Sequence, residues 1–296
     1  MRQRLNRICA LGLVLAIGPL TALAQDLELI SNLQLRSDAT QFGGLSAIAM
    51  APNGRSMNLL SDRGYLLRAE IIRADGTATN LSLGSIRTLR GQDGSRAELR
   101  GQRDSEGLAF GPNDTLYVSF EGDHRLALHS LTGALIAAIP PHPDFVHLEV
   151  NASLEALAVD PAGQLFTLPE RSGDWAVPFP VYRFANGAWQ PNFSIPRRGR
   201  YLAVGADIGP DGRFYLLERD FRGLFGFSTR IRRFDINDYG FVDEETLLVT
   251  SLGVHGNLEG ISIWRSGDGH LIASMISDDN FSGWLKTEFV EYRLPD

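Results

Sequence analysis

A short apolar run, a turn rich in proline or glycine, and a second apolar run ending in acidic residues recur five times along this chain. The first runs and their turns align without gaps at residues 45–54, 105–114, 154–163, 203–212 and 258–267. Proline presets φ in such a turn, and glycine or asparagine takes the left-handed position. The second runs begin at Asn58, Leu116, Leu165, Phe214 and Leu271. Each unit therefore predicts a β-hairpin.

The spacing of the units predicts how the hairpins are assembled. The second position of each unit is occupied by Ser46, Glu106, Glu155, Val204 or Glu259. These positions follow one another at similar intervals, and the stretch from the last of them through both chain ends to the first makes one more interval of that kind. Each interval is long enough for a four-stranded blade, and no segment between the units has a helical period. We predict an all-β fold, a β-propeller of five or six four-stranded blades. A sixth blade would lie in the longest interval, through residues 66–73 and 78–89.

The two ends of the chain supply the strands that the last unit still needs. Residues 27–35 and residues 288–294 each have the composition of a strand. We expect these N- and C-terminal strands to pair with each other. Such pairing closes the ring and removes the exposed sheet edges.

The segment 1–24 has the three parts of a secretory signal peptide. A basic segment with three arginines is followed by an apolar run over residues 8–20 and by the small-residue sequence Ala22-Leu23-Ala24. We expect cleavage near Ala24, a single propeller domain over residues 25–296, and a location in the periplasm or outside the cell. No later segment is suited to stable membrane insertion.

The composition of the chain after cleavage limits the kinds of site that it can form and the ligands that it suits. The single cysteine, Cys9, lies in the signal, so the mature chain has no thiol for a disulfide, a thiolate metal site or a cysteine nucleophile. Three of the 28 basic side chains also leave with the signal, which gives 25 basic against 35 acidic residues, or a charge of about −10. Such an acidic chain is unsuited to nucleic acids and anionic membranes and is suited to cations.

Acidic residues recur at equivalent places in the repeats. The second strand of a hairpin runs antiparallel to the first, so the start of the first strand and the end of the second lie at the same end of the ring. Three first strands begin with Glu106, Glu155 and Glu259. The five second strands end with Asp62, Glu121, Glu170, Glu218 and Asp278. We expect these eight acids to converge at one mouth of the central channel.

Acids gathered at one mouth repel one another unless cations are present. Calcium takes six to eight oxygen ligands, so the eight acids are candidate calcium ligands. Arginines at the same mouth, Arg171 and Arg219 among them, would add sites for an anion. A purely structural role is the alternative, in which the acids bind backbone amides or the arginines that directly follow three of them, Arg63, Arg171 and Arg219.

Three segments resemble the phytase-like family, which is described as having esterase-like activity of phytase. They are residues 103–109, 153–158 and 257–261, and the resemblance runs from about Gly43 to the C-terminus. It implies an exported β-propeller that hydrolyses phosphate esters, with bridging calcium ions that activate water. It also implies metal ligands at Glu106, Glu155 and Glu259 and at their second-strand partners Glu121, Glu170 and Asp278. Two repeats depart from the pattern, with Ser46 and Val204 in place of the acid.

These observations lead to a calcium-dependent hydrolase of phosphate or other small esters as the first hypothesis, with metal-activated water as the nucleophile and a small anionic ester as the expected partner. Glu106, Glu155 and Glu259 would carry the chemistry, and Arg171 or Arg219 would bind the anion. The chain has no G-x-S-x-G nucleophile elbow, H-E-x-x-H motif or phosphate-binding loop, so a serine-hydrolase mechanism has no support. A lactonase-type propeller and a non-catalytic propeller that binds another small-molecule ligand or a partner remain as alternatives.

Overall fold

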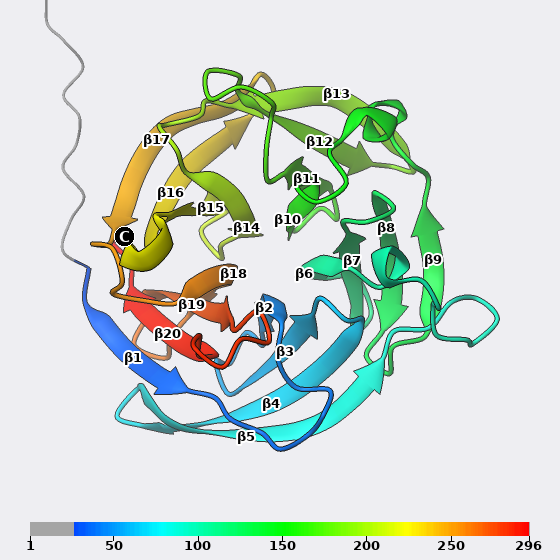
Figure 1. The fold of residues 1–296 in the computed structure, drawn as a ribbon. Helices are drawn as coiled ribbons and strands as arrows, with labels where there is room; N and C mark the ends of the chain where they lie inside the picture. The colour runs from blue at the N-terminus through cyan, green and yellow to red at the C-terminus, as the bar shows by residue number, and fades with distance from the viewer. Residues whose placement is uncertain (1–26, 296) are drawn as a thin grey trace, which may run out of the picture.

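The chain forms five four-stranded antiparallel sheets arranged in a ring (Figure 1). The computed structural model describes residues 27–295, so the predicted signal peptide over residues 1–24 lies outside the described residues. The fold is all-β, a five-bladed β-propeller, as the repeat predicts. Within residues 27–295, no helix is long and apolar enough to cross a membrane.

Each blade begins at the central channel and ends at the rim. The first blade contains β2 (Leu45–Met50), β3 (Ser56–Ser61), β4 (Tyr65–Ala74) and β5 (Thr77–Thr88). The second contains β6 (Ser105–Phe110), β7 (Thr115–Phe120), β8 (Arg125–Ser130) and β9 (Leu135–Ile139). The third contains β10 (Leu154–Val159), β11 (Leu165–Pro169), β12 (Phe179–Ala185) and β13 (Ala188–Ile195).

The last two blades follow the same order, and the fifth uses both chain ends. The fourth contains β14 (Leu202–Ile208), β15 (Phe214–Phe221), β16 (Phe227–Asn237) and β17 (Gly240–Val249). The fifth contains β18 (Asn257–Arg265), β19 (Leu271–Asp278), β20 (Glu288–Arg293) and β1 (Leu29–Gln34). Strands β1 and β20 pair antiparallel, with Gln34 opposite Glu288, so the predicted closure of the ring is confirmed.

The longest interval between units holds no sixth blade. Residues 66–73 belong to β4 and residues 78–89 fall almost entirely in β5, the two outer strands of the first blade. These strands have 10 and 12 residues, whereas β8 and β9 of the second blade have 6 and 5. The extra length of the first repeat therefore extends its outer hairpin.

The core lies between the blades. Five hydrophobic clusters fill the ring, and each joins residues of two neighbouring blades. Every residue of β2 and of β3 is buried because neighbouring blades cover both faces of an inner strand, whereas most of β5 is exposed or half-buried. This position explains why the inner strands read as continuous apolar runs rather than as alternating ones.

The inner strands meet closely because each has a small residue just after its aligned position. These residues are Ala47, Gly107, Ala156, Gly205 and Gly260. A Cβ atom on Gly205 would lie 2.4 Å from the carbonyl oxygen of Glu259, and one on Gly260 would lie 2.8 Å from the Cα atom of Ala47. The space left between the inner strands is only about 10 Å³. The channel is therefore closed in the middle and has a separate cavity at each end.

The two ends of the ring differ in their connections. Links from second to third strands, and from one blade to the next, lie at the end where the first strands begin, and these include the long segments 89–104, 140–153 and 279–287. The opposite end has short turns within hairpins. Several large apolar side chains in the long segments and neighbouring loops are exposed, including Val146, Trp175, Leu224 and Trp284.

Candidate functional site

A cavity of about 620 Å³ opens at the end of the ring where the first strands begin. We call it the acidic mouth. Its lining contains eight carboxylates and only three guanidinium groups. The acids are Asp62, Asp104, Glu106, Glu121, Glu155, Glu170, Glu259 and Asp278, and the arginines are Arg100, Arg171 and Arg219. Seven of the eight acids predicted from the repeats thus come together, and the structure adds Asp104.

The ladder between first and second strands sets the position of the second-strand acids. The backbone N–H groups of Asp62, Glu121 and Glu170 each donate to a carbonyl oxygen just before a first strand, at 2.8 Å. Asp278 is paired with Asn257 at the corresponding place in the fifth blade. All four side chains therefore stand at the same level of the ring and line the same cavity.

Glu218 does not join this group. In the fourth blade Arg219, paired with Leu202, takes the place that Asp62, Glu121, Glu170 and Asp278 have in the others. Glu218 lies one residue earlier, and successive side chains of a strand point to opposite faces. It is fully buried and accepts hydrogen bonds from Arg230 at 2.6 Å and from Arg232 at 2.7 Å. Apolar spacing in the sequence cannot reveal a shift of one residue at the end of a strand.

The first-strand glutamates stand at irregular positions in the ladder. The pairing register shifts between Ser105 and Leu108, between Leu154 and Ala156, and between Leu258 and Gly260. Each shift leaves a glutamate unpaired, namely Glu106, Glu155 or Glu259. Such a bulge re-aims a side chain and interrupts the ladder. Here all three glutamates line the acidic mouth.

Asp104 was missed because it precedes the aligned repeat. It lies just before β6, and its carbonyl oxygen accepts the hydrogen bond from the backbone N–H of Glu121, which brings Asp104 to the same level of the ring as Glu121. One carboxylate oxygen each from Asp104, Glu106 and Glu121 lie within 4.8 Å of one another. The signal in the sequence was an acid close to Glu106 at the entry of the first strand.

Arg219 is the main cation inside the acidic mouth. Its guanidinium donates to Glu170 at 2.9 Å and to both Glu259 and Asn257. Burial lowers the pKa of Arg219, but the charges of Glu259, Glu170 and Glu155 outweigh it and leave the pKa raised. With its side chain only 18% exposed, Arg219 balances carboxylates and is not open to an incoming anion.

Arg171 is more available than Arg219. Its side chain is 48% exposed, with Nε 3.4 Å from an oxygen of Glu170. Arg100 also lines the acidic mouth and is exposed. Arg63, which directly follows Asp62, places its guanidinium over the ring of Phe281, 3.0 Å from the ring centroid. The anion-binding role predicted for Arg171 or Arg219 is therefore better suited to Arg171 and Arg100.

Some of the acids have structural partners and others do not. The Glu121 carboxylate accepts a hydrogen bond from the backbone N–H of Ser153 at 3.3 Å, and Asp278 accepts one from that of Asn280 at 2.7 Å. Asn257 donates to Glu259 at 2.8 Å. The carboxylate of Glu106 receives no hydrogen bond from the residues that the structure describes, although Glu106 is buried.

Burial and mutual repulsion raise the pKa values at the acidic mouth. Burial, followed by the charges of neighbouring acids, holds the pKa of Glu106 and of Glu155 well above the usual range. Burial is also the largest cause of a pKa of about 7 for Glu121 and about 8 for Asp278. The acidic mouth holds more carboxylates than its arginines neutralise, so it favours protons or a metal cation.

Comparison with known proteins gives a family and a fold. Residues 40–281 match the model of the family described as Phytase-like, esterase-like activity of phytase. Among curated proteins, none matches this sequence significantly.

Two solved structures are similar in fold. The catalytic domain of an α-L-arabinofuranosidase from Coprinopsis cinerea has a TM-score of 0.56 and 12% identity, with 91% of this chain and 98% of that chain covered. An α-L-arabinofuranosidase from Podospora anserina in complex with cellotriose has a TM-score of 0.52 and 10% identity, with 91% and 97% covered. At these identities the similarity establishes the propeller fold and nothing further.

Proposed function

This chain belongs to the phytase-like family, and we propose that it is a hydrolase of phosphate or other small esters that needs a divalent cation, calcium first, at the acidic mouth. The observation that carries the proposal is the excess of eight carboxylates over three arginines in one cavity. The family description names an esterase-like activity.

Export to the periplasm or the medium is part of the proposal and rests on the signal-like segment 1–24. N-terminal sequencing of the natural protein should begin near Gln25.

The residues present fit a calcium ion. Calcium binds hard oxygen ligands, and Asp104, Glu106 and Glu121 bring three carboxylates within 4.8 Å of one another. Glu106 is the strongest candidate because its carboxylate has no hydrogen-bond donor within the described part of the chain. Further carboxylates in the same lining complete the set of candidate ligands, namely Asp62, Glu170, Glu259 and Asp278, with Glu155 as a ligand only if another acid is the base. Glu218 is not a candidate calcium ligand because its carboxylate oxygens accept hydrogen bonds from Arg230 and Arg232.

A bound cation would neutralise the acids, polarise the ester oxygen and lower the pKa of an attacking water. The protein itself contributes a base and anion-binding groups. Glu155 lines the acidic mouth beside Glu121 but lies outside the group of Asp104, Glu106 and Glu121, so it is the candidate base that accepts the proton of the water once a cation has lowered its pKa. Arg171 and Arg100 line the acidic mouth, are exposed, and would hold the anionic part of the substrate.

Calcium binding is tested by thermal and chemical unfolding of chelator-treated protein. Saturating calcium, at about 100 times the dissociation constant, should stabilise the fold by about 2.7 kcal/mol. The variants Glu106→Gln and Asp104→Asn should lose most of this gain. Glu70→Gln, on an exposed part of β4, is the matched control and should keep it. Unfolding that is indifferent to chelation in the unmodified protein would contradict the metal site.

Turnover is tested with p-nitrophenyl phosphate, p-nitrophenyl acetate and a γ-lactone, with calcium and with chelator. We expect calcium-dependent hydrolysis of an ester, reduced about 10²–10⁴-fold in Glu155→Gln if this residue is the base. Hydrolysis of the lactone alone would identify the lactonase-type alternative. Calcium-dependent stability with no turnover on any substrate would favour a propeller that binds a ligand without catalysis.

A further inference from the structure

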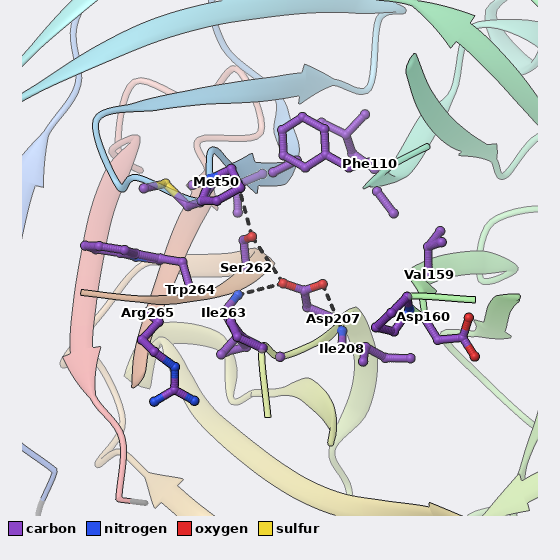
Figure 2. Close-up of a pocket in the computed structure, with 18 residues that line it drawn as sticks. Met50, Phe110, Val159, Asp160, Asp207, Ile208, Ser262, Ile263, Trp264 and Arg265 are labelled. Atoms are coloured by element: carbon purple, nitrogen blue, oxygen red, sulfur yellow. Dashed lines mark hydrogen bonds between the residues drawn. The ribbon is translucent and has the colours of Figure 1, made fainter. Parts of the chain in front are cut away.

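A second cavity, of about 540 Å³, lies at the opposite end of the ring. It is formed where the five inner strands end and their hairpin turns begin, so all five blades contribute to it. Figure 2 shows that the labelled lining is mostly apolar, with Met50, Phe110, Val159 and Trp264 among the side chains that surround it. We call it the apolar mouth.

The apolar mouth is separate from the acidic mouth. Between the two cavities the inner strands pack closely enough to leave only about 10 Å³. Gly107, Gly205 and Gly260 permit this approach, because a Cβ atom at each would meet a neighbouring blade at less than 3.0 Å. A small molecule bound at the apolar mouth therefore does not touch the carboxylates of the proposed hydrolase site.

One carboxylate, that of Asp207, lies in the middle of the apolar lining (Figure 2). One oxygen accepts hydrogen bonds from the backbone N–H of Ile263 at 2.6 Å and from the hydroxyl of Ser262 at 3.1 Å. The other accepts a single hydrogen bond, from the N–H of Ile208 at 2.8 Å. A carboxylate oxygen has two acceptor positions, so the second oxygen keeps room for a further donor.

No cation neutralises Asp207 within the described residues. Arg265 is the one basic residue of the lining, and its guanidinium donates to the carbonyl of Gly269 at 2.7 Å. Asp160, the other acid of the lining, adds negative charge. Burial raises the pKa of Asp207 to about 7, which reflects a carboxylate held among protein atoms without a positive partner.

The repeat itself does not require a carboxylate at this place. The residues equivalent to Asp207 in the other four blades are Ala49, Ala109, Ala158 and Ser262. Three of the five inner strands thus make the same ladder with alanine. Asp207 does link the fourth blade to the fifth through Ser262 and Ile263, but its second oxygen serves no bond between blades.

We propose that the apolar mouth binds a small molecule with an apolar body and a protonated amine. Its volume falls in the range of ligand pockets, whose walls are mainly apolar with a few polar groups that fix orientation. An ammonium group would donate to the second oxygen of Asp207 and supply the missing positive charge. An anion would face two carboxylates, and a neutral apolar ligand would leave Asp207 buried without a cation.

Three probes of similar shape test the charge requirement by calorimetric titration of the mature chain. They are 2-phenylethylamine, 2-phenylethanol and phenylacetate. We expect the amine to bind at least tenfold more tightly than the alcohol, and phenylacetate not to bind. Asp207→Asn should weaken amine binding at least tenfold. Asp114→Asn, at an exposed turn of the same end outside the lining, is the matched control and should bind like the parent protein.

A second variant keeps the test decisive if Asp207→Asn fails to fold. Phe110 is 37% exposed and lines the cavity, so Phe110→Ala should fold and should bind the amine at least threefold more weakly. Calcium and chelator should not change amine affinity, because the two cavities are separate. Equal affinity for amine and alcohol, no amine binding at millimolar concentration, or unchanged affinity in the folded variants would each overturn the proposal.

Discussion

The same five inner strands build two cavities of opposite character. Where the strands begin, eight carboxylates and long connecting segments surround the acidic mouth. Where they end, short hairpin turns and mainly apolar side chains surround the apolar mouth, with Asp207 and Asp160 as its two acids. The small residues in the middle of the strands separate the two.

The two cavities show which positions of an inner strand vary between repeats and which do not. Positions at the start of each inner strand differ from blade to blade, with Glu, Ser or Val, whereas the apolar positions in the middle stay buried in the five clusters between blades. The start of an inner strand lines a cavity, whereas its middle is enclosed by the neighbouring blades, so polar residues are accommodated at the start. Both candidate sites therefore lie at strand ends.

The largest effect is expected at the acid that does not belong to the acidic mouth. Glu218→Gln would leave Arg230 and Arg232 buried without their main charge partner, which should destabilise the fold by about 3–5 kcal/mol. The matched change Glu106→Gln, measured with chelator, should leave stability unchanged or higher because it removes repulsion among carboxylates. Urea unfolding of both variants measures the difference. Equal losses would show that Glu106 is also a structural acid.

The closed middle of the channel predicts a smaller loss. A methyl group on Gly260 would lie 2.8 Å from Ala47 Cα and from Ile48 N, so Gly260→Ala should destabilise the fold by about 1–3 kcal/mol. Gly267→Ala is the control, since a Cβ atom there meets nothing within 4 Å. Urea unfolding again gives the measurement. If Gly260→Ala were as stable as Gly267→Ala, the inner strands would be less tightly packed than the structure shows.

The acids of the acidic mouth should make the stability of the fold depend on pH, because their pKa values are raised. Asp62, Glu121 and Asp278 have pKa values raised by burial to about 6, 7 and 8, above their ordinary values of 3.8 or 4.5. An acid whose pKa is raised in the folded state contributes stability below its ordinary pKa. This contribution is lost as the pH rises through the raised pKa. With chelator present, the melting temperature should therefore fall between pH 5.5 and 8.5.

Two comparisons sharpen the pH test. Asp278→Asn should flatten the slope in chelator because one titrating group is removed. Calcium should flatten it as well, by stabilising the ionised acids at high pH. A melting temperature that rises with pH in chelator would contradict the raised pKa values.

The smallest effect is expected in the loops around the acidic mouth. Leu224 is fully exposed, so Leu224→Ser should change the free energy of unfolding by less than about 0.5 kcal/mol. Leu217→Ser, at a fully buried position of the neighbouring strand β15, is the contrasting variant and should cost several times more. A large decrease in the free energy of unfolding for Leu224→Ser would mean that the Leu224 side chain makes packing contacts that stabilise the fold.

The sequence alone determined the hairpins, the ring and its closure. Apolar runs, turn residues and regular spacing depend on local backbone preferences and on burial, which leave a periodic record in the chain. The same record predicted that acids of several blades meet at one end, because antiparallel strands leave no other arrangement. It also left five and six blades open, since the long outer hairpin β4–β5 has the length of additional strands.

Only the tertiary structure decided which side chains enter each cavity. The register of β15 turns Glu218 into the protein and brings Arg219 to the acidic mouth, while Asp104 joins Glu106 and Glu121 there. Asp207 acquires a candidate role only because five strand ends enclose a mainly apolar cavity around it. A side chain changes face with a shift of one residue, and a cavity depends on how separate blades pack. Neither is recorded in the local pattern of the chain.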